Sequence, residues 1–165
     1  MELSGGTYES LGFSHKREST RKREAFFLDF AEKIVKPLTK TKAYITGGLK
    51  TAGTMVKALE TVDGIGLGRP ACQEFHLPKD ILEGKVTSAI KPAIDEDQSD
   101  LTMPLGGVLI KQVGKDHEPE DMSLKENVEG FLKDLEVWGK MMAEDTEMKE
   151  YQFFDPSTPP RPYVE

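Results

Sequence analysis

Two glycine-bearing segments of the chain hold the residues best suited to bind an anion. One is Thr46-Gly47-Gly48, and the other is Gly66-Leu67-Gly68-Arg69. Glycine lets the backbone approach a ligand closely, so that N–H groups can donate to it. Arginine adds a permanent charge on a planar group that matches phosphate. A phosphate site is therefore predicted, with five contributing residues: Gly47, Gly48, Gly66, Gly68 and Arg69. The glycines alone would also fit two tight turns.

The other reactive residue types do not suggest a second site. The histidines, His15, His76 and His117, are far apart in sequence and have no ligand-like spacing, so no metal site is predicted. Cys72 is the single cysteine, and we expect a small packing residue, although a position near a helix N-terminus could make its thiol more acidic. No GxGxxG motif follows either strand, which argues against a Rossmann site.

The segments that must position these glycines alternate between helix and strand. Residues 43–46 and 62–67 are short and apolar, and each is a predicted strand that ends in glycine. Helices are predicted over residues 20–35, from Thr51 as N-cap and from Pro70 in a first turn, with a further helical turn at residues 79–83. Such alternation predicts parallel strands, whose carboxyl ends share the edge where ligands bind.

The spacing of apolar residues predicts which helix faces are buried. On the first helix the face consists of Phe26, Phe27, Phe30, Ala31 and Ile34. On the second helix it consists of Ala52, Met55, Val56 and Leu59.

The C-terminal half gives weaker signals until its last helix. Residues 87–122 are expected to form a loop-rich connection with a possible helix over residues 101–113, which Gly106-Gly107 weakens. Ser123 and Glu126 have the spacing of a capping box, so a helix is predicted over residues 123–148. Its apolar face would be Val128, Phe131, Leu135, Trp138 and Met142. Four prolines make residues 149–165 an extended or disordered tail.

Composition limits the classes of partner. The 165 residues carry a formal net charge of -7, which argues against nucleic-acid binding because phosphate neutralisation needs clustered Lys and Arg. One cysteine fits a reducing compartment, and the N-terminal residues lack the features of a signal peptide. No apolar run has the length of a membrane span. We therefore expect a soluble, cytoplasmic protein.

Several motifs, taken together and in this order, resemble a known family. They are residues 2–9 (ELSGGTYE), 15–20 (HKREST), 23–27 (REAFF), 44–48 (YITGG) and 62–70 (VDGIGLGRP). The chain resembles the C-terminal part of the old yellow enzyme family, most closely its fungal NADH:flavin oxidoreductases. The resemblance is good over residues 1–86 and looser through Trp138.

This resemblance implies an FMN-binding (β/α)8 TIM barrel, of which residues 1–86 would be the last part. Residues 2–4 would end the sixth strand, and residues 44–46 and 65–67 would be the seventh and eighth, with a C-terminal helical extension. Gly47 and Gly48 would match the phosphate donors after strand seven. Gly66, Gly68 and Arg69 would match those after strand eight.

The family's activity passes a hydride from NAD(P)H through FMN to a small-molecule acceptor such as an activated alkene. Its substrate-binding and proton-donating residues precede Met1 in the family pattern. No catalytic residue is therefore assigned to this chain, which is expected to be inactive alone, as a fragment or truncated copy.

Two other functions remain open at this stage. The chain could be a non-catalytic module for flavin phosphate or for protein interaction, which completes its sheet by homo-oligomerisation or with a partner that carries the missing barrel half. The helix around Trp138 could instead serve as a partner-binding face, although a packed helix is the default.

Overall fold

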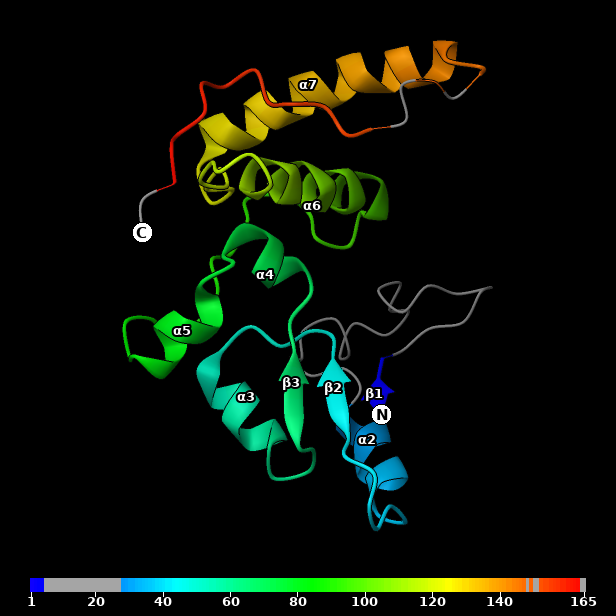
Figure 1. The fold of residues 1–165 in the computed structure, drawn as a ribbon, viewed down its shortest axis with the longest axis vertical. Helices are drawn as coiled ribbons and strands as arrows, with labels where there is room; N and C mark the ends of the chain where they lie inside the picture. Colours follow the sequence, from blue (N-terminus) through cyan, green and yellow to red (C-terminus); the bar gives the residue numbers. More distant parts are fainter. Residues whose placement is uncertain (5–27, 148, 150–151, 164–165) are drawn as a thin grey trace. The chain divides into compact units, whose positions relative to one another are not determined.

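The computed structural model describes residues 1–4, 28–147, 149 and 152–163, which form two compact units (Figure 1). The first unit comprises Met1–Ala71 and Phe75–Ala89. The second comprises Cys72–Glu74 and Ile90–Glu165. Each unit has its own hydrophobic core, and each is described separately below.

The first unit is built on a small parallel sheet. Strands β1 (Glu2–Leu3), β2 (Tyr44–Thr46) and β3 (Gly64–Gly66) lie side by side in that order. Glu2 is opposite Tyr44, and Thr46 is opposite Gly66, with every pairing parallel. The predicted α/β class and parallel strands are confirmed. A three-stranded parallel sheet is consistent with part of a barrel, and the assignment of that part to a TIM barrel stays a prediction.

Four helices connect or follow these strands: α2 (Leu28–Val35), α3 (Ala52–Ala58), α4 (Arg69–Gln73) and α5 (Leu77–Leu82). The predicted cap of α3 is confirmed, since the Thr51 side chain accepts a hydrogen bond of 3.2 Å from the backbone N–H of Thr54. Pro70 lies in the first turn of α4, as predicted. The part of the first predicted helix that precedes Leu28 lies outside the described residues.

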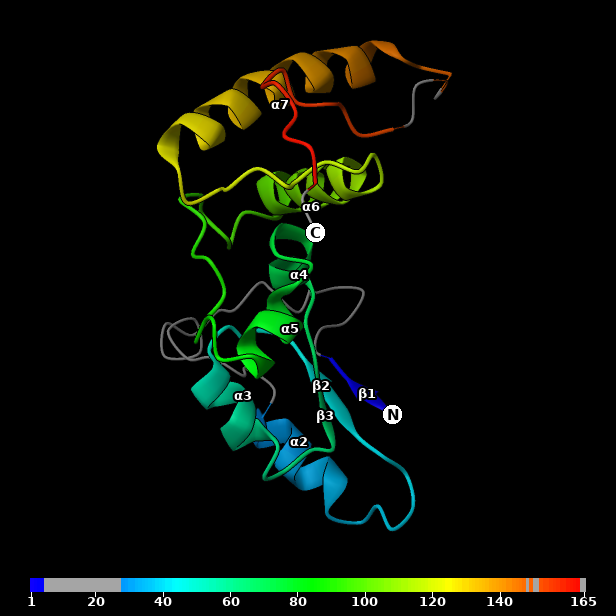
Figure 2. The same cartoon turned by 60° about the vertical axis from the view of Figure 1, so that its left-hand side comes forward.

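Helices α2 and α3 lie along one face of the sheet and form the core with it (Figure 2). Leu3 and Ile45 point from alternate strand positions towards this face. The helices contribute mainly Ala31, Met55 and Ala58, which are buried. The small side chains of Ala31 and Ala58 let the helices lie close to the strands.

The predicted helix faces are partly wrong. Phe30 and Leu59 are each 49% exposed, and Val56 is 66% exposed. Ala31 and Met55 of the predicted faces are buried, and Ile34 packs partly buried against the core, so this part of the prediction is confirmed. The helices approach the sheet on these residues and on Ala58, which leaves the other three side chains exposed. Phe26 and Phe27 lie outside the described residues.

The second unit is a pair of long helices, α6 (Ser99–Val113) and α7 (Lys125–Glu144). Leu105, Val108 and Leu109 of α6 pack with Val128 and Phe131 of α7. The possible helix at residues 101–113 is therefore a full helix despite its two glycines, since tertiary packing outweighs weak intrinsic propensity.

The predicted capping box at the start of α7 is wrong. The helix begins at Lys125 after an N-cap at Leu124, which provides no side-chain hydrogen bond. The Ser123 hydroxyl instead donates to Asp121 Oδ1 at 2.7 Å, and the Ser123 backbone N–H donates to the same atom at 2.9 Å. Asp121 offers a carboxylate two residues away, and such local turns compete with helix caps.

The proline-rich tail was expected to be extended or disordered, and its described residues 152–163 are extended and lie along α7 (Figures 1 and 2). We call its described residues 152–163 the strap. Near its end, the Glu118 backbone N–H donates to the Arg161 carbonyl at 2.9 Å, and the Tyr163 N–H donates to the Asp116 carbonyl at 3.0 Å. These bonds join the strap to the segment between α6 and α7.

Candidate functional site

Both predicted glycine segments leave the sheet at the same edge. Gly47-Gly48 follows β2, and Leu67-Gly68 follows β3. Because Thr46 and Gly66 are paired in a parallel register, the residues after them emerge side by side. The structure thus brings together two segments that are separated by about twenty residues of sequence and one helix, α3.

The backbone at the first segment requires glycine. Gly47 has φ 124° and Gly48 has φ 70°, a region that L-residues with a Cβ rarely adopt. The two glycines are therefore needed for the turn itself. They also leave this stretch of backbone without side chains that would keep a ligand away.

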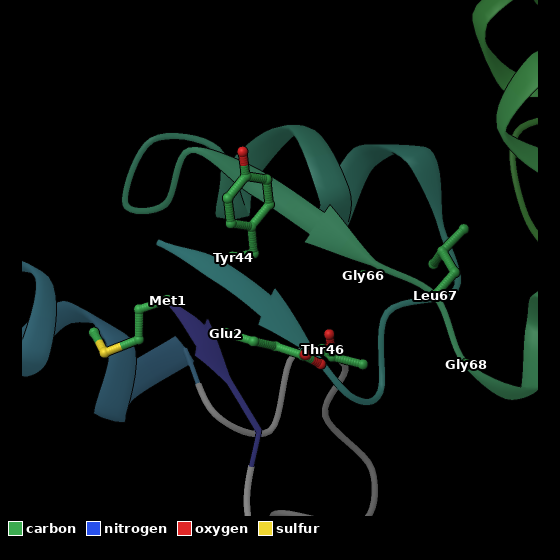
Figure 3. Close-up of a pocket in the computed structure, with 7 residues that line it drawn as sticks. All are labelled: Met1, Glu2, Tyr44, Thr46, Gly66, Leu67 and Gly68. Carbon is green, nitrogen blue, oxygen red and sulfur yellow. The ribbon is translucent and has the colours of Figure 1, made fainter. Parts of the chain in front are cut away.

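An open hollow of about 570 Å³ lies over the sheet at this place (Figure 3). Seven residues line it, from the three strands, from the residue before β1 and from the segment after β3: Met1, Glu2, Tyr44, Thr46, Gly66, Leu67 and Gly68. Two of the five predicted site residues, Gly66 and Gly68, belong to this lining. Within the described part of the chain, Gly47, Gly48 and Arg69 are not among the lining residues.

The glycines of β3 make room for side chains of β2. A Cβ on Gly64 would collide with the Tyr44 ring, and one on Gly66 would collide with the Thr46 hydroxyl. Side chains alternate along a strand, so Tyr44 and Thr46 lie on the face opposite the buried Ile45. Sequence reasoning missed Tyr44 and Thr46 as lining residues, although their positions on either side of the apolar Ile45 in a predicted strand were the signal that could have revealed them.

Arg69 is the first residue of α4 and directly follows Gly68. It is exposed and belongs to the first unit, as do both glycine segments. Its position in the chain keeps its backbone close to the carboxyl end of β3. Its assignment to a phosphate site stays a prediction.

An ion pair holds the strands at the opposite edge of the sheet. Lys42 Nζ lies 2.6 Å from Asp63 Oδ1, and Asp63 Oδ2 accepts a hydrogen bond of 2.9 Å from the backbone N–H of Ala43. The bond from Lys42, and then that from Ala43, lowers the pKa of Asp63. The same pair raises the pKa of Lys42. These contacts join the residues that precede β2 and β3.

Cys72 lies in the second unit and packs at the edge of the core of α6 and α7. Burial raises the pKa of its thiol, which disfavours the reactive thiolate. Cys72 therefore has the environment of a packing residue, as we expected from the sequence.

The described residues show neither a metal site nor a membrane-spanning helix. No group of three or more His, Cys, Asp or Glu side chains in the described ranges is arranged to hold a metal ion. None of the helices in those ranges combines the length and apolar character that crossing a membrane requires.

The chain is similar to fungal proteins of one named activity. It is 43% identical over 147 residues to the NADH-dependent flavin oxidoreductase nadA of Aspergillus parasiticus, a match that takes in 88% of this chain and 33% of that protein. It is 37% identical over 90 residues to the NADH-dependent flavin oxidoreductase iccE of Talaromyces variabilis, over 50% of this chain and 22% of the relative. No protein-family model matches the chain.

These relatives confirm the resemblance inferred from the motifs. The chain spans about a third of the length of the first relative, so the similarity covers only a part of that protein. Because that match takes in 88% of the chain, it must also extend past Val86 into the second unit. The sequence segments that form α6 and α7 here therefore fall at least in part within that match.

Proposed function

We propose that this chain, which is similar over most of its length to part of an NADH-dependent flavin oxidoreductase, is the segment of such an enzyme that binds the flavin phosphate. The flavin would be FMN, and NADH or NADPH would be the reductant. The observation that carries the proposal is the meeting of two glycine turns and the start of α4 at one edge of a parallel sheet.

The geometry fits a dianionic group in three ways. Gly47 and Gly48 leave the turn after β2 free of side chains, and their conformation excludes most other residues. Gly68 has open space where a Cβ would lie, so a ligand atom could approach its backbone. Arg69 adjoins Gly68 and would add a charged, bidentate donor.

When bound, FMN would supply the hydride-transfer chemistry, which belongs to the cofactor. The residues of this chain would anchor the phosphate and so position the flavin over the hollow lined by Tyr44 and Thr46. We assign no proton donor and no substrate-binding residue to the chain. The whole enzyme would have an activity of the ene-reductase type. The chain alone would be inactive, so it would not oxidise NADH in the presence of FMN.

A titration of the full chain with FMN tests the site. Arg69→Ala should weaken binding by roughly 1.5–3 kcal/mol, the scale of a charged hydrogen bond. Gly68→Ala should also weaken binding while leaving the fold intact, since no atom lies within 4 Å of the added Cβ. Lys57→Ala, on α3, removes a charge elsewhere in the same unit and is the matched control.

Equal FMN affinity for the wild type, Arg69→Ala and Gly68→Ala would remove both residues from the site. If all variants, including the wild type, fail to bind FMN while remaining folded, the segment alone is not a flavin-binding unit.

The sheet itself favours a second candidate. Within the described residues, β1 and β3 are the outer strands, and outer strands offer unpaired backbone groups for further pairing. The chain would then act as a non-catalytic module that completes its sheet with a second copy or with a partner that carries the remaining strands. Size-exclusion chromatography with light scattering distinguishes the outcomes, because a monodisperse oligomer supports the module and a monomer contradicts self-association.

A further inference from the structure

The strap is attached to α7 by aromatic contacts at its beginning. The Trp138 indole N–H donates to the Gln152 carbonyl at 2.9 Å. The Trp138 ring centroid lies 5.8 Å from that of Phe153 and 6.1 Å from that of Phe154. The Trp138 face, which the sequence offered as a possible partner-binding surface, is thus in contact with the protein's own tail.

The far part of the strap covers a buried carboxyl group, that of Glu120. Glu120 is 7% exposed, and in the described part of the chain its Oε1 has no hydrogen-bond partner. The Thr158 side chain, from the strap, is hydrogen-bonded to the Glu120 carboxyl group. A buried polar atom that lacks a partner is costly, and the cost is greatest when the group is charged.

The elements packed around Glu120 present two charged side chains and two neutral ones. Asp134 of α7 and Arg161 of the strap are the charged neighbours. Gln112 of α6 and Gln73 of α4 are neutral, and they bond the Glu120 backbone at 3.2 Å and 2.5 Å, respectively. One positive and one negative neighbour give little net compensation for an ionised Glu120.

We propose that the strap residues 157–163 form a pH-sensitive latch, which is closed over Glu120 when this residue is protonated and loosened when it is ionised. Opening these residues would remove Thr158 and Arg161 from above the carboxyl group and admit water to it. It would also break the Ser157 N–H bond to Asp134 Oδ2 at 2.7 Å.

The direction of the pH dependence follows from the burial of Glu120. Burial raises its pKa in the closed state, and the Thr158 hydrogen bond and Arg161 oppose this shift without reversing it. Glu120 therefore binds its proton more tightly when the strap is closed than when it is open. The extra stability of the closed state is fully present below the open-state pKa and is lost as pH rises through the closed-state pKa.

Hydrogen exchange of two backbone amides tests the latch in the full chain. The Glu118 and Tyr163 N–H groups donate across the latch and are exposed when it opens. After correction for the intrinsic exchange rate, the wild-type opening constant should rise by at least roughly threefold between pH 4.5 and pH 8, since each pKa unit is a factor of ten. Glu120→Gln should remain closed across this range.

The matched control is Glu129→Gln, on the exposed side of α7, which makes the same charge change and should behave as the wild type. His117 and Asp155 are other titratable groups in or near the strap, and both are present in the wild type and in Glu120→Gln. A difference in pH dependence between these two proteins therefore comes from Glu120. Thr158→Val keeps Glu120 but removes the hydrogen bond that lowers its pKa, so the rise in the opening constant should extend to higher pH. The fluorescence of Trp138, the single tryptophan, reports whether each variant keeps the packing of the second unit.

Equal pH profiles for the wild type and Glu120→Gln, with Trp138 still packed, would overturn the proposal. If Glu120→Gln loses the Trp138 packing, the test rests on Thr158→Val alone. The proposal is then overturned if the opening constant of Thr158→Val has the same pH dependence as that of the wild type.

Discussion

The backbone conformation directly constrains the identity of Gly47 and Gly48. Both have positive φ angles, at 124° and 70°, where an added Cβ is strained whatever space surrounds it. The same two residues form the turn that the proposed phosphate site needs. A structural requirement and a binding role therefore coincide at these positions, and the two can be separated by experiment.

Alanine substitutions should destabilise the chain at these two positions and not at a helical glycine. We expect Gly47→Ala and Gly48→Ala each to lower the free energy of unfolding by roughly 1–2 kcal/mol, the cost of a left-handed conformation. Gly53→Ala, inside α3 with no atom within 4 Å of the new Cβ, should raise it by about 0.5–1 kcal/mol. Urea denaturation measures all three, and a stabilising effect at Gly47 or Gly48 would contradict the observed backbone.

At the scale of elements, two adjacent glycines in α6 have different surroundings. Gly107 faces the Phe153 ring of the strap so closely that a Cβ would collide with it. Gly106 has room, since its nearest neighbour would be Cys72 Sγ at 3.8 Å. The Gly-Gly pair that weakened the helix prediction therefore has a packing reason at one of its two positions.

This difference predicts opposite outcomes for the two substitutions. Gly107→Ala should displace Phe153 and shift the fluorescence of Trp138, whose ring contacts Phe153. Gly106→Ala should leave the fluorescence unchanged and stabilise α6 by about 0.5–1 kcal/mol. An unchanged spectrum for Gly107→Ala would show that the strap does not depend on this contact.

At the scale of the whole molecule, the described residues form two separate cores. Ile45, fully buried, belongs to the core around the sheet, and Phe131, 2% exposed, belongs to the core of α6 and α7. Both units fall at least in part within the match to the Aspergillus relative. The proposed flavin site lies in the first unit and the proposed latch in the second, so the two proposals can fail independently.

Substitutions in the two cores should act mainly on their own units. Ile45→Ala should cost about 2–5 kcal/mol and Phe131→Ala about 3–5 kcal/mol, the range for large apolar residues cut back to alanine in cores. Leu132→Ala, beside Phe131 and 41% exposed, should cost no more than about 0.5 kcal/mol. Residue-resolved hydrogen exchange should show each core variant losing protection first within its own unit, and an equal loss over both would contradict the division.

The sequence by itself determined features that depend on neighbouring residues. The Thr51 cap, Pro70 at the start of α4 and the extended proline-rich tail were predicted correctly, because each follows from the conformational limits of one or a few adjacent residues. The alternation of helix and strand also predicted parallel strands, which places both glycine turns at one edge. These features need no knowledge of what packs against them.

Only the tertiary structure decided which surfaces are covered and which atoms meet. The exposure of Val56 and Leu59, the contact of Tyr44 with Gly64 and the burial of Glu120 under the strap depend on residues that are distant in sequence. Apolar spacing marks several possible buried faces on a helix, and packing selects among them by shape. A carboxyl group likewise acquires its environment from the elements that close over it, and its own sequence neighbours do not specify them.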